Sequence, residues 1–547
     1  MSREDTNSIP AIVEDFIDRV VKKVRYRKKV RQDVRAELEA HFEDALSDCS
    51  NSTEKEQLAA SLIEGFGDTQ CLAKLIRRAK KRCRPIWVKG LIRTAQVAGL
   101  CVLYVVLCAS RLYIGSPTIK IDTVAWLNES MRQERDESLN ARHELTEACA
   151  VLSKAPSNLR KWPRLIQDMN DVQRQTVETY LTENRSALDH FRQAASKPNY
   201  WPFYAPIESM PELTGSGTFA VPGLMDNMAM SAHLSNQCSE SARTIRQLAF
   251  AMDYQIQWET EQDEIDQALS DCVAMTRCGR FMAGTGLLLE ELVGVAITAL
   301  GHRSTLHVLE VADVSETQLA STYSQLNAIL QSDIPFMPLD FEKALINDFV
   351  QRSFTDDGQG NGRILASGMM LAASSATQSL KGLLLFDYPD RREITNKIDL
   401  FYNKIETQSG LSPWQLHERP VESEATDNFW YMDLLGPAFA RTAQLGWRLK
   451  TNNEATLAII GIKHYQATQG GLPASLEELP QAGLVNSIPR DYYSDGPLGY
   501  HRTEDGFTLY SQGEDMKDDG GKLAVNDKGE IRKYAAHGDW VYWPITR

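Results

Sequence analysis

The feature that most limits how this chain can fold is a stretch of 17 residues without a charge, TAQVAGLCVLYVVLCAS at 94–110. A helix needs about 20 apolar residues to cross the core of a bilayer. Residues 112–114 extend the stretch, and the Arg111 side chain can reach back to the interface. The sequence therefore predicts one transmembrane helix within residues 85–115. The alternative is a buried helix of a soluble protein.

A basic segment precedes this stretch. Residues 77–93, RRAKKRCRPIWVKGLIR, contain eight Lys or Arg residues and no acid. Segments rich in Lys and Arg stay on the cytoplasmic side of a membrane. The first residues, MSREDTNSIP, are polar, so we expect an uncleaved anchor. The N-terminus is expected in the cytosol, and the chain after about residue 115 is expected to be exported.

Charge is distributed unevenly along the 547 residues, whose net charge is −14. Residues 1–93 hold 20 Lys or Arg and 15 Asp or Glu, whereas the remaining residues hold 39 and 58. Phosphate contacts need clustered Lys and Arg side chains. We therefore expect no nucleic-acid partner, and we expect the basic segment to contact the membrane.

Residues 1–84 are predicted to form a cytosolic bundle of four short helices. A Thr53–Glu56 capping box is expected to start the third helix, and Asp68 is expected to cap the fourth. On a helix of roughly 27–48, an apolar residue recurs at every fourth position: Val30, Val34, Leu38, Phe42 and Leu46.

The sequences VRAELEAHFEDAL and LIEGFGDTQCLAKLIRRAKKR in this segment follow a recognisable order. An acidic helix with an EL..H.E core is followed by an FGD turn and a basic helix that leads to the membrane. This order resembles the HAAS domain of bacterial membrane proteins, also called the permease prefix domain. The resemblance implies a signalling or regulatory module at the bacterial inner membrane, with protein partners on both sides.

Residues 116–427 are predicted to be an exported, mainly helical region, with long helices at 123–152 and 171–195. The aromatic run YWPFYAP at 200–206 interrupts the helical pattern with two prolines. We interpret it as a buried connector, with an aromatic binding platform as the alternative. The apolar segment 281–300 is interpreted as a core helix, because two adjacent acids interrupt it.

No catalytic motif is recognisable in this region. Glu290 and Glu291 point about 100° apart on a helix, so they do not form an obvious acid/base pair. Whether the protein is an enzyme stays open, with non-catalytic roles favoured. Four cysteines are expected in an oxidising space, where one or more disulfides can form. Among Cys149, Cys238, Cys272 and Cys278, the last two are near enough in sequence to join.

Residues 428–547 are predicted to form a small α+β domain. A long helix begins near 428 and ends at Gly470–Gly471, and LGYHR and GFTLYS are predicted to be strands of a hairpin. One face of the later part of the helix is formed by Ala455, Ala458, Ile459, Ile462 and Gln466.

Three segments of this domain, IKHYQATQGGLPASLEEL, SIPRDYYSDGPLGY and GFTLYSQGEDMKDDGG, occur in an order that resembles the globular part of the major pseudopilin of type II secretion. The resemblance implies a helix that lies on a small sheet. It also implies that the acidic loop before two glycines binds calcium. Six residues fit the family pattern: Gly470, Pro473, Pro489, Asp491, Tyr500 and Gly513.

The residues implied as calcium ligands are Asp515, Asp518 and Asp519, with Asp539 returning from the segment GDWVYW. Calcium prefers six to eight oxygen ligands, and crowded carboxylates repel each other unless a cation lies among them. An EF-hand register fails, because Lys517 falls on the third ligand position. The alternative is a solvated acidic turn that closes a hairpin.

The function expected from these features is that of a single-pass membrane-anchored envelope protein. It is expected to act through protein–protein interaction, as a scaffold or a signalling protein, without catalysis. One alternative is an exported hydrolase that uses acids near residues 200–206 in the helical middle region. A second alternative is a subunit associated with a secretion system.

Overall fold

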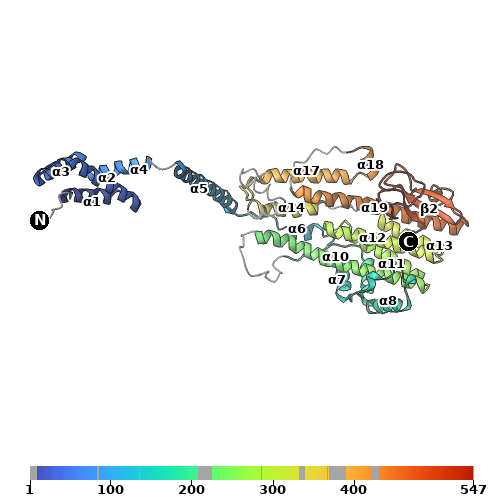
Figure 1. Ribbon diagram of the computed structural model, residues 1–547. Coiled ribbons are helices and arrows are strands. Elements are labelled where there is room, and N and C mark those ends of the chain that lie inside the picture. The colour runs from blue at the N-terminus through green and yellow to red at the C-terminus, as the bar shows by residue number, and fades with distance from the viewer. Residues whose placement is uncertain are drawn as a thin grey trace. The chain divides into compact units, whose positions relative to one another are not determined.

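The structure is a computed structural model in which the chain divides into two compact units, Met1–Leu107 and Cys108–Arg547 (Figure 1). We call them the N-terminal unit and the C-terminal unit. The described residues are 9–82, 86–134, 136–206, 224–284, 286–331, 339–365, 368, 390–420 and 430–545. The chain is mainly helical with one small sheet, as predicted. The predicted domain boundaries at 84–85 and 427–428 lie outside the described residues.

The N-terminal unit confirms the four helices expected before the apolar stretch. They are α1 (Ala11–Lys23), α2 (Lys28–Leu46), α3 (Ser52–Phe66) and α4 (Thr69–Arg82). The predicted apolar face of α2 is buried at four of its five positions. Phe16 of α1 packs edge-on against Phe42 of α2, with 6.0 Å between ring centroids. Burial of this shared face holds the four short helices together.

Capping side chains mark where two helices of this unit begin. Asp68 caps α4 as expected, because its carboxylate accepts a hydrogen bond from the Cys71 amide at 3.0 Å. The expected Thr53–Glu56 capping box is wrong. The helix α3 begins at Ser52, and Asn51 is its cap, accepting from the Thr53 amide at 3.4 Å. Thr53 therefore lies within the first turn.

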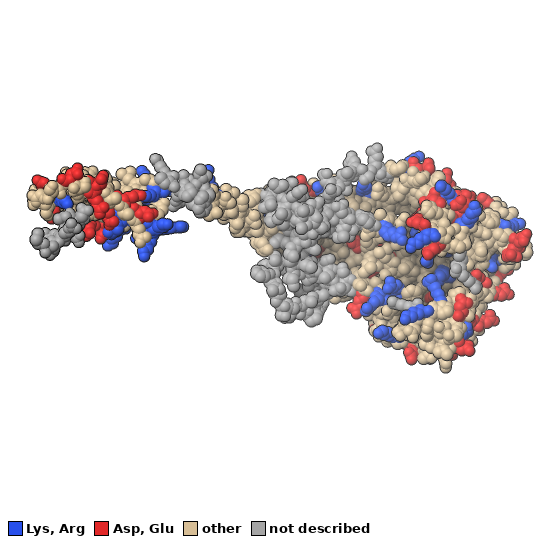
Figure 2. All heavy atoms as spheres, in the orientation of Figure 1, with Lys and Arg blue, Asp and Glu red and all other residues tan. Residues whose placement is uncertain are grey.

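Two helices in the described parts of the chain are long and apolar enough to cross a membrane. The first lies within α5 (Ile86–Tyr113) and has a mean hydropathy of 1.9, with 6% of its apolar window buried. The second is α12 (Leu288–Val311), with a mean hydropathy of 1.2 and 72% of its window buried. Figure 2 shows mainly uncharged atoms along α5. The surroundings of α12 are those of a core helix, as predicted, but the predicted helix over 281–300 is wrong in its bounds. Phe281 and Met282 belong to α11, and α12 begins at Leu288.

Among its described residues, the C-terminal unit contains short 3₁₀ turns at Glu137–Leu139, Leu159–Lys161 and Ile166–Asp168. Its α-helices are α6 (Thr123–Ser130), α7 (Arg142–Val151), α8 (Asp171–Glu183), α9 (Arg185–Ser196), α10 (Leu224–Glu261), α11 (Ile265–Met282), α12, α13 (Glu316–Leu330), α14 (Leu339–Ser353), α17 (Arg391–Ser409), α18 (Pro413–Glu418), α19 (Trp430–Gln469) and α20 (Glu478–Gln481). The central pair is α11 and α12, against which α10, α13 and α19 pack.

Two of the predicted helices are interrupted, and a buried asparagine lies within each interruption. The expected helix over 123–152 is broken between α6 and α7, where the Asn140 side chain exchanges hydrogen bonds of 3.1 Å with the Trp201 backbone. The expected helix over 171–195 is broken at Asn184, whose amide donates to the Ser153 hydroxyl at 2.8 Å. These tertiary contacts override the local helical pattern.

The sheet follows α19 and has the order β1–β2–β3, with both pairs antiparallel. Its strands are β1 (Gly499–Thr503), β2 (Gly506–Ser511) and β3 (Trp540–Trp543). Both predicted hairpin strands are confirmed, with Tyr500 opposite Leu509. The end of α19 at Gly470, which has a φ of 73°, is also as predicted.

The sheet and the helices share one hydrophobic core. On α19, four of the five predicted face residues, Ala455, Ala458, Ile459 and Ile462, are fully buried. They pack in one cluster with Leu319 and Leu326 of α13 on one side and with the sheet on the other. The core therefore extends from residues before 428 into the sheet.

The four cysteines expected to be exported are all free thiols in the structure, so the expected disulfide is wrong. Cys272 and Cys278 are buried on the same helix, α11, at positions six residues apart. Residues at this spacing point about 120° apart on a helix and are separated by roughly 9 Å along its axis, so the two sulfurs cannot meet.

Glycines allow α11 and α12 to approach closely. A Cβ atom at Gly294 would lie 2.5 Å from the Ala283 amide nitrogen, a backbone atom that cannot rotate away. We expect Gly294→Ala to lower the free energy of unfolding by about 1–3 kcal/mol, because the two helices must separate. Denaturant unfolding of the full chain in detergent measures the change.

The matched control is Gly471→Ala, since a Cβ atom there would meet nothing within 4 Å. Its effect should stay within about 0.5 kcal/mol, as is usual for surface substitutions. Equal stabilities of the two variants would contradict the close approach of α11 and α12.

Candidate functional site

The acidic loop after β2 is held in shape by backbone hydrogen bonds to its carboxylates. Asp515 accepts from the Gly538 amide at 3.0 Å. Asp518 accepts from the Tyr510 hydroxyl and the Gly520 amide, both at 2.9 Å. These hydrogen bonds use carboxylate lone pairs that could otherwise coordinate a cation. Each carboxylate still has further acceptor positions.

Asp539 is the buried member of this group. Its side chain is completely buried at the start of the segment that leads into β3, and one oxygen accepts from the Gly521 amide at 2.7 Å. The other oxygen, Oδ1, has no hydrogen-bond partner among the described residues. Burial, together with the charges of Asp518 and Asp519, raises the pKa of Asp539 to about 6.

The structure places Asp518 and Asp519 near Asp539, but in the described residues it does not gather the four predicted calcium ligands into one metal-binding group. Asp518 and Asp519 approach Asp539 closely enough to affect its charge, whereas Asp515 is bound to Gly538. Within the described residues, no group of three or more Asp, Glu, His or Cys side chains is arranged to hold a metal ion. The unpartnered Asp539 oxygen fits a cation, because a buried acceptor left without a donor is costly.

The aromatic run at 200–206 is a buried connector, as the sequence predicted. Tyr200, Trp201 and Tyr204 are buried, and Phe203 alone among its rings is exposed. The Tyr204 hydroxyl donates to Glu290 at 2.5 Å. Burial raises the pKa of Glu290, whose side chain lies in the core at the start of α12. Glu290, which accepts from this aromatic run, is thus part of the packed interior. The acids that follow the run in sequence, Glu208 and Glu212, lie outside the described residues.

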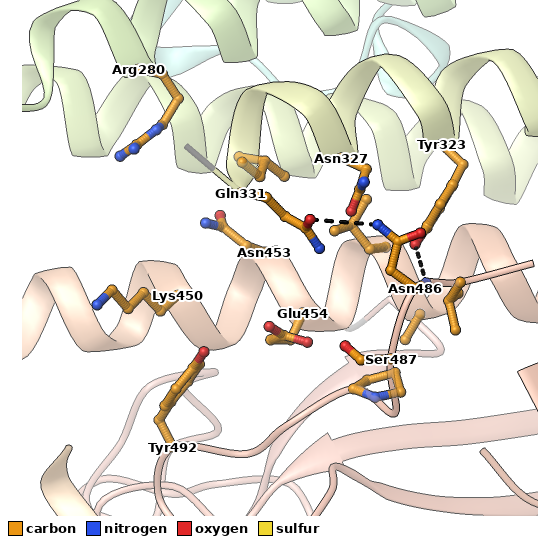
Figure 3. A pocket seen from close by; sticks show the side chains of 15 residues that line it. Arg280, Tyr323, Asn327, Gln331, Lys450, Asn453, Glu454, Asn486, Ser487 and Tyr492 are labelled. Atoms are coloured by element: carbon orange, nitrogen blue, oxygen red, sulfur yellow. Dashed lines mark hydrogen bonds between the residues drawn. The ribbon is translucent and has the colours of Figure 1, made fainter. Parts of the chain in front are cut away.

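A cavity of about 360 Å³ lies between α11, α13, α19 and the loop that connects α20 to β1 (Figure 3). Each wall contributes polar side chains. From α11 comes Arg280, and from the connecting loop comes Tyr492. The residues that α13 and α19 contribute are Tyr323, Asn327, Leu330, Gln331, Lys450, Asn453, Glu454, Leu457 and Ala458.

Hydrogen bonds fix the polar groups of the cavity. The Asn486 amide donates to the Tyr323 hydroxyl at 2.8 Å, which joins the connecting loop to α13. The amide oxygen of Asn453 lies 2.7 Å from the ring nitrogen Nε2 of buried His302. Glu454 accepts from the Arg490 backbone amide at 3.2 Å. The lining is therefore a prearranged set of amides, hydroxyls and charges.

Burial shifts the pKa values of two charged groups that line this cavity. Arg280 is 4% exposed, and burial lowers its pKa while the nearby Glu291 carboxylate acts in the opposite direction. Burial also raises the pKa of Glu454. The Lys450 ammonium lies 4.3 Å from the centroid of the Trp447 ring. Arg280, Lys450 and Glu454 thus line one small, partly desolvated space, in which charges interact strongly.

Sequence analysis missed this cavity. Its charged residues are separated by about 170 positions along the chain, from Arg280 to Lys450. One local signal was available, because TNNEA places Asn453 and Glu454 in the middle of an apolar helix. Polar side chains at such positions are either bonded in a core or face a cavity.

No family model, curated protein or solved structure matches the chain.

The raised pKa of Asp539 predicts a measurable pH dependence. The folded chain holds this proton up to about pH 6, while the ordinary value is 3.8, so stability falls as pH rises between these values. We expect Asp539→Asn to remove this loss, which is at most about 3 kcal/mol. Above pH 6 in chelator, Asp539→Asn should melt at a higher temperature than the unaltered chain.

At pH 4 the melting temperatures of the two proteins should be nearly equal, since the folded chain then carries a neutral Asp539. The control is Asp505→Asn, which changes an exposed carboxyl on the turn between β1 and β2. A constant difference between Asp539→Asn and the unaltered chain at every pH would contradict the raised pKa.

Proposed function

We propose that this protein is a single-span envelope protein of the bacterial inner membrane, with residues 1–84 in the cytosol, a span within residues 85–115 and the rest of the chain exported. The observation that carries the proposal is the exposure of α5. Its apolar window has a mean hydropathy of 1.9 and is 6% buried, while the comparable window of α12 is 72% buried. Exposed apolar surface on this scale is costly in water and is stabilised within a bilayer.

The basic segment before α5 supports the proposed orientation. Residues 77–93 carry eight Lys or Arg residues and no acid, and such segments stay in the cytoplasm. The exported unit would then be the larger and more acidic part of the chain. Its core joins α12, α13, α19 and the sheet, so it would be exported as one folded body.

We infer that the protein acts through binding to other proteins, as a scaffold or signalling protein. The N-terminal unit supports this with a groove of about 360 Å³ that is lined mainly by apolar side chains of α2, α3 and α4. These side chains include Leu38, Phe66 and Leu72, with His41 at the exposed surface. An apolar groove on a small helical bundle suits a partner helix. The resemblance to HAAS domains points in the same direction.

We also propose that the acidic loop of the C-terminal unit binds calcium, with Asp518, Asp519 and Asp539 as ligands. The unpartnered, buried Asp539 oxygen supports this assignment. A cation that binds the folded chain alone raises stability, by about 2.7 kcal/mol at a hundredfold excess over the dissociation constant. Calcium should therefore raise the melting temperature of the unaltered chain and leave that of Asp539→Asn unchanged.

The topology is tested with reporter fusions in living cells. A reporter that is active only after export should be active when fused after Lys120 or after Arg547. A reporter that is active only in the cytosol should be active when fused after Arg82, at the end of α4. Cytosolic activity of the fusion at Arg547 would overturn the proposed placement of the C-terminal unit.

The role of the groove is tested with a photo-crosslinking amino acid in place of His41. In cells, this position should give a discrete adduct of higher mass, because the side chain lies at the groove. The matched control is Gln57, an exposed position on α3 that does not line the groove. Equal labelling of the two positions, or no discrete adduct from His41, would contradict a binding role for the groove.

A further inference from the structure

The cavity between α11, α13 and α19 has charged groups at one end and neutral polar groups at the other. Figure 3 shows Arg280 and Lys450 at one end, with Asn327 and Asn486 at the other and Glu454 between them. The volume, about 360 Å³, lies at the lower end of the range for small-molecule sites. A ligand that fits this volume must be small. To match the lining, it must carry one group that accepts hydrogen bonds from the cations and one that donates a hydrogen bond to the carboxylate.

One buried group of the cavity calls for a donor. The side-chain oxygen of Asn327 is buried and has no hydrogen-bond partner among the described residues. A buried acceptor in this state is costly unless a water molecule or a ligand donates to it. The Glu454 carboxylate lies in the same space and accepts from a backbone amide at 3.2 Å, with further acceptor capacity left.

The other end of the cavity is lined by two cationic side chains. Arg280 and Lys450 both line it, and Lys450 and Glu454 lie one helical turn apart on the same face of α19. A phosphate ion would meet the Glu454 charge and be repelled. An apolar ligand would leave the amides and charges of the lining unsatisfied. A molecule with separated positive and negative charges satisfies both ends.

We propose that this cavity binds a small zwitterion of the size of an amino acid or a dipeptide. The carboxylate of the ligand contacts Arg280 and Lys450. Its ammonium group contacts Glu454, and an N–H group donates to the Asn327 oxygen. This inference is independent of the proposed membrane topology, because the cavity lies wholly within the C-terminal unit.

Binding is measured by calorimetry on the full chain in detergent at pH 8. The probes are L-leucine, L-glutamine and L-alanyl-L-alanine. Each is compared with its amide, which lacks the carboxylate, and with its N-acetyl form, which lacks the ammonium group. At least one probe should bind with a dissociation constant below 1 mM, and both modified forms of that probe should bind at least tenfold more weakly.

Two variants identify the contacts. Lys450→Met should weaken the probe about tenfold and leave binding of its amide unchanged, since the amide has no charge for Lys450 to contact. Glu454→Gln should weaken the probe in the same way and leave binding of its N-acetyl form unchanged. Because Lys450 also lines a neighbouring cavity and Glu454 does not, the second variant assigns the effect to this cavity.

The matched control is Lys463→Met on the same helix. Lys463 lies 4.8 Å from the Trp543 ring centroid, much as Lys450 lies against Trp447, but it does not line the cavity. Binding by Lys463→Met should equal that of the unaltered chain, and the melting temperature of every variant shows whether it is folded. The proposal is overturned if no probe binds, if charged and modified probes bind equally, or if Lys450→Met and Lys463→Met behave alike.

Discussion

Burial of one face of α19 is the constraint on which the C-terminal unit depends. Ala455, Ala458, Ile459 and Ile462 are fully buried, and they contact α13 on one side and the sheet on the other. The small side chains let the neighbouring elements come close, and the larger ones fill the space between them. Because both sides of the contact share this helix, the sheet cannot form its core without the helical part of the unit.

The cavity is a consequence of the same packing. On α19, Lys450, Asn453 and Glu454 come shortly before the buried face, so the helix changes from polar to apolar within about one turn. Leu319 and Leu326 of α13 pack in one cluster with the apolar face. The cavity lies beside the polar residues, where α13 and the connecting loop also line it.

Local sequence was sufficient for elements whose contacts are local. Helices α1 to α4, the end of α19 at Gly470 and the strand GFTLYS were all predictable from periodicity and turn residues. The break at Asn184 was not, because it depends on a partner elsewhere in the chain, Ser153. A buried asparagine that finds such a partner ends a helix that its neighbours in sequence would continue.

The two candidate sites also differ in how much of each could be predicted from local sequence. The acidic loop is contiguous, so its carboxylates were found in the sequence, whereas the burial of Asp539 and its unpartnered oxygen depend on how the chain folds back before β3. The cavity is lined by segments around 280, 327, 454 and 492, and no spacing rule connects these positions.

The two apolar helices α5 and α12 also cannot be told apart from their sequences alone. The two sequences pass the same test for a membrane helix, and their burial is what distinguishes them. Apolar composition limits a helix to a bilayer or a core, and the partners supplied by the rest of the chain decide between the two.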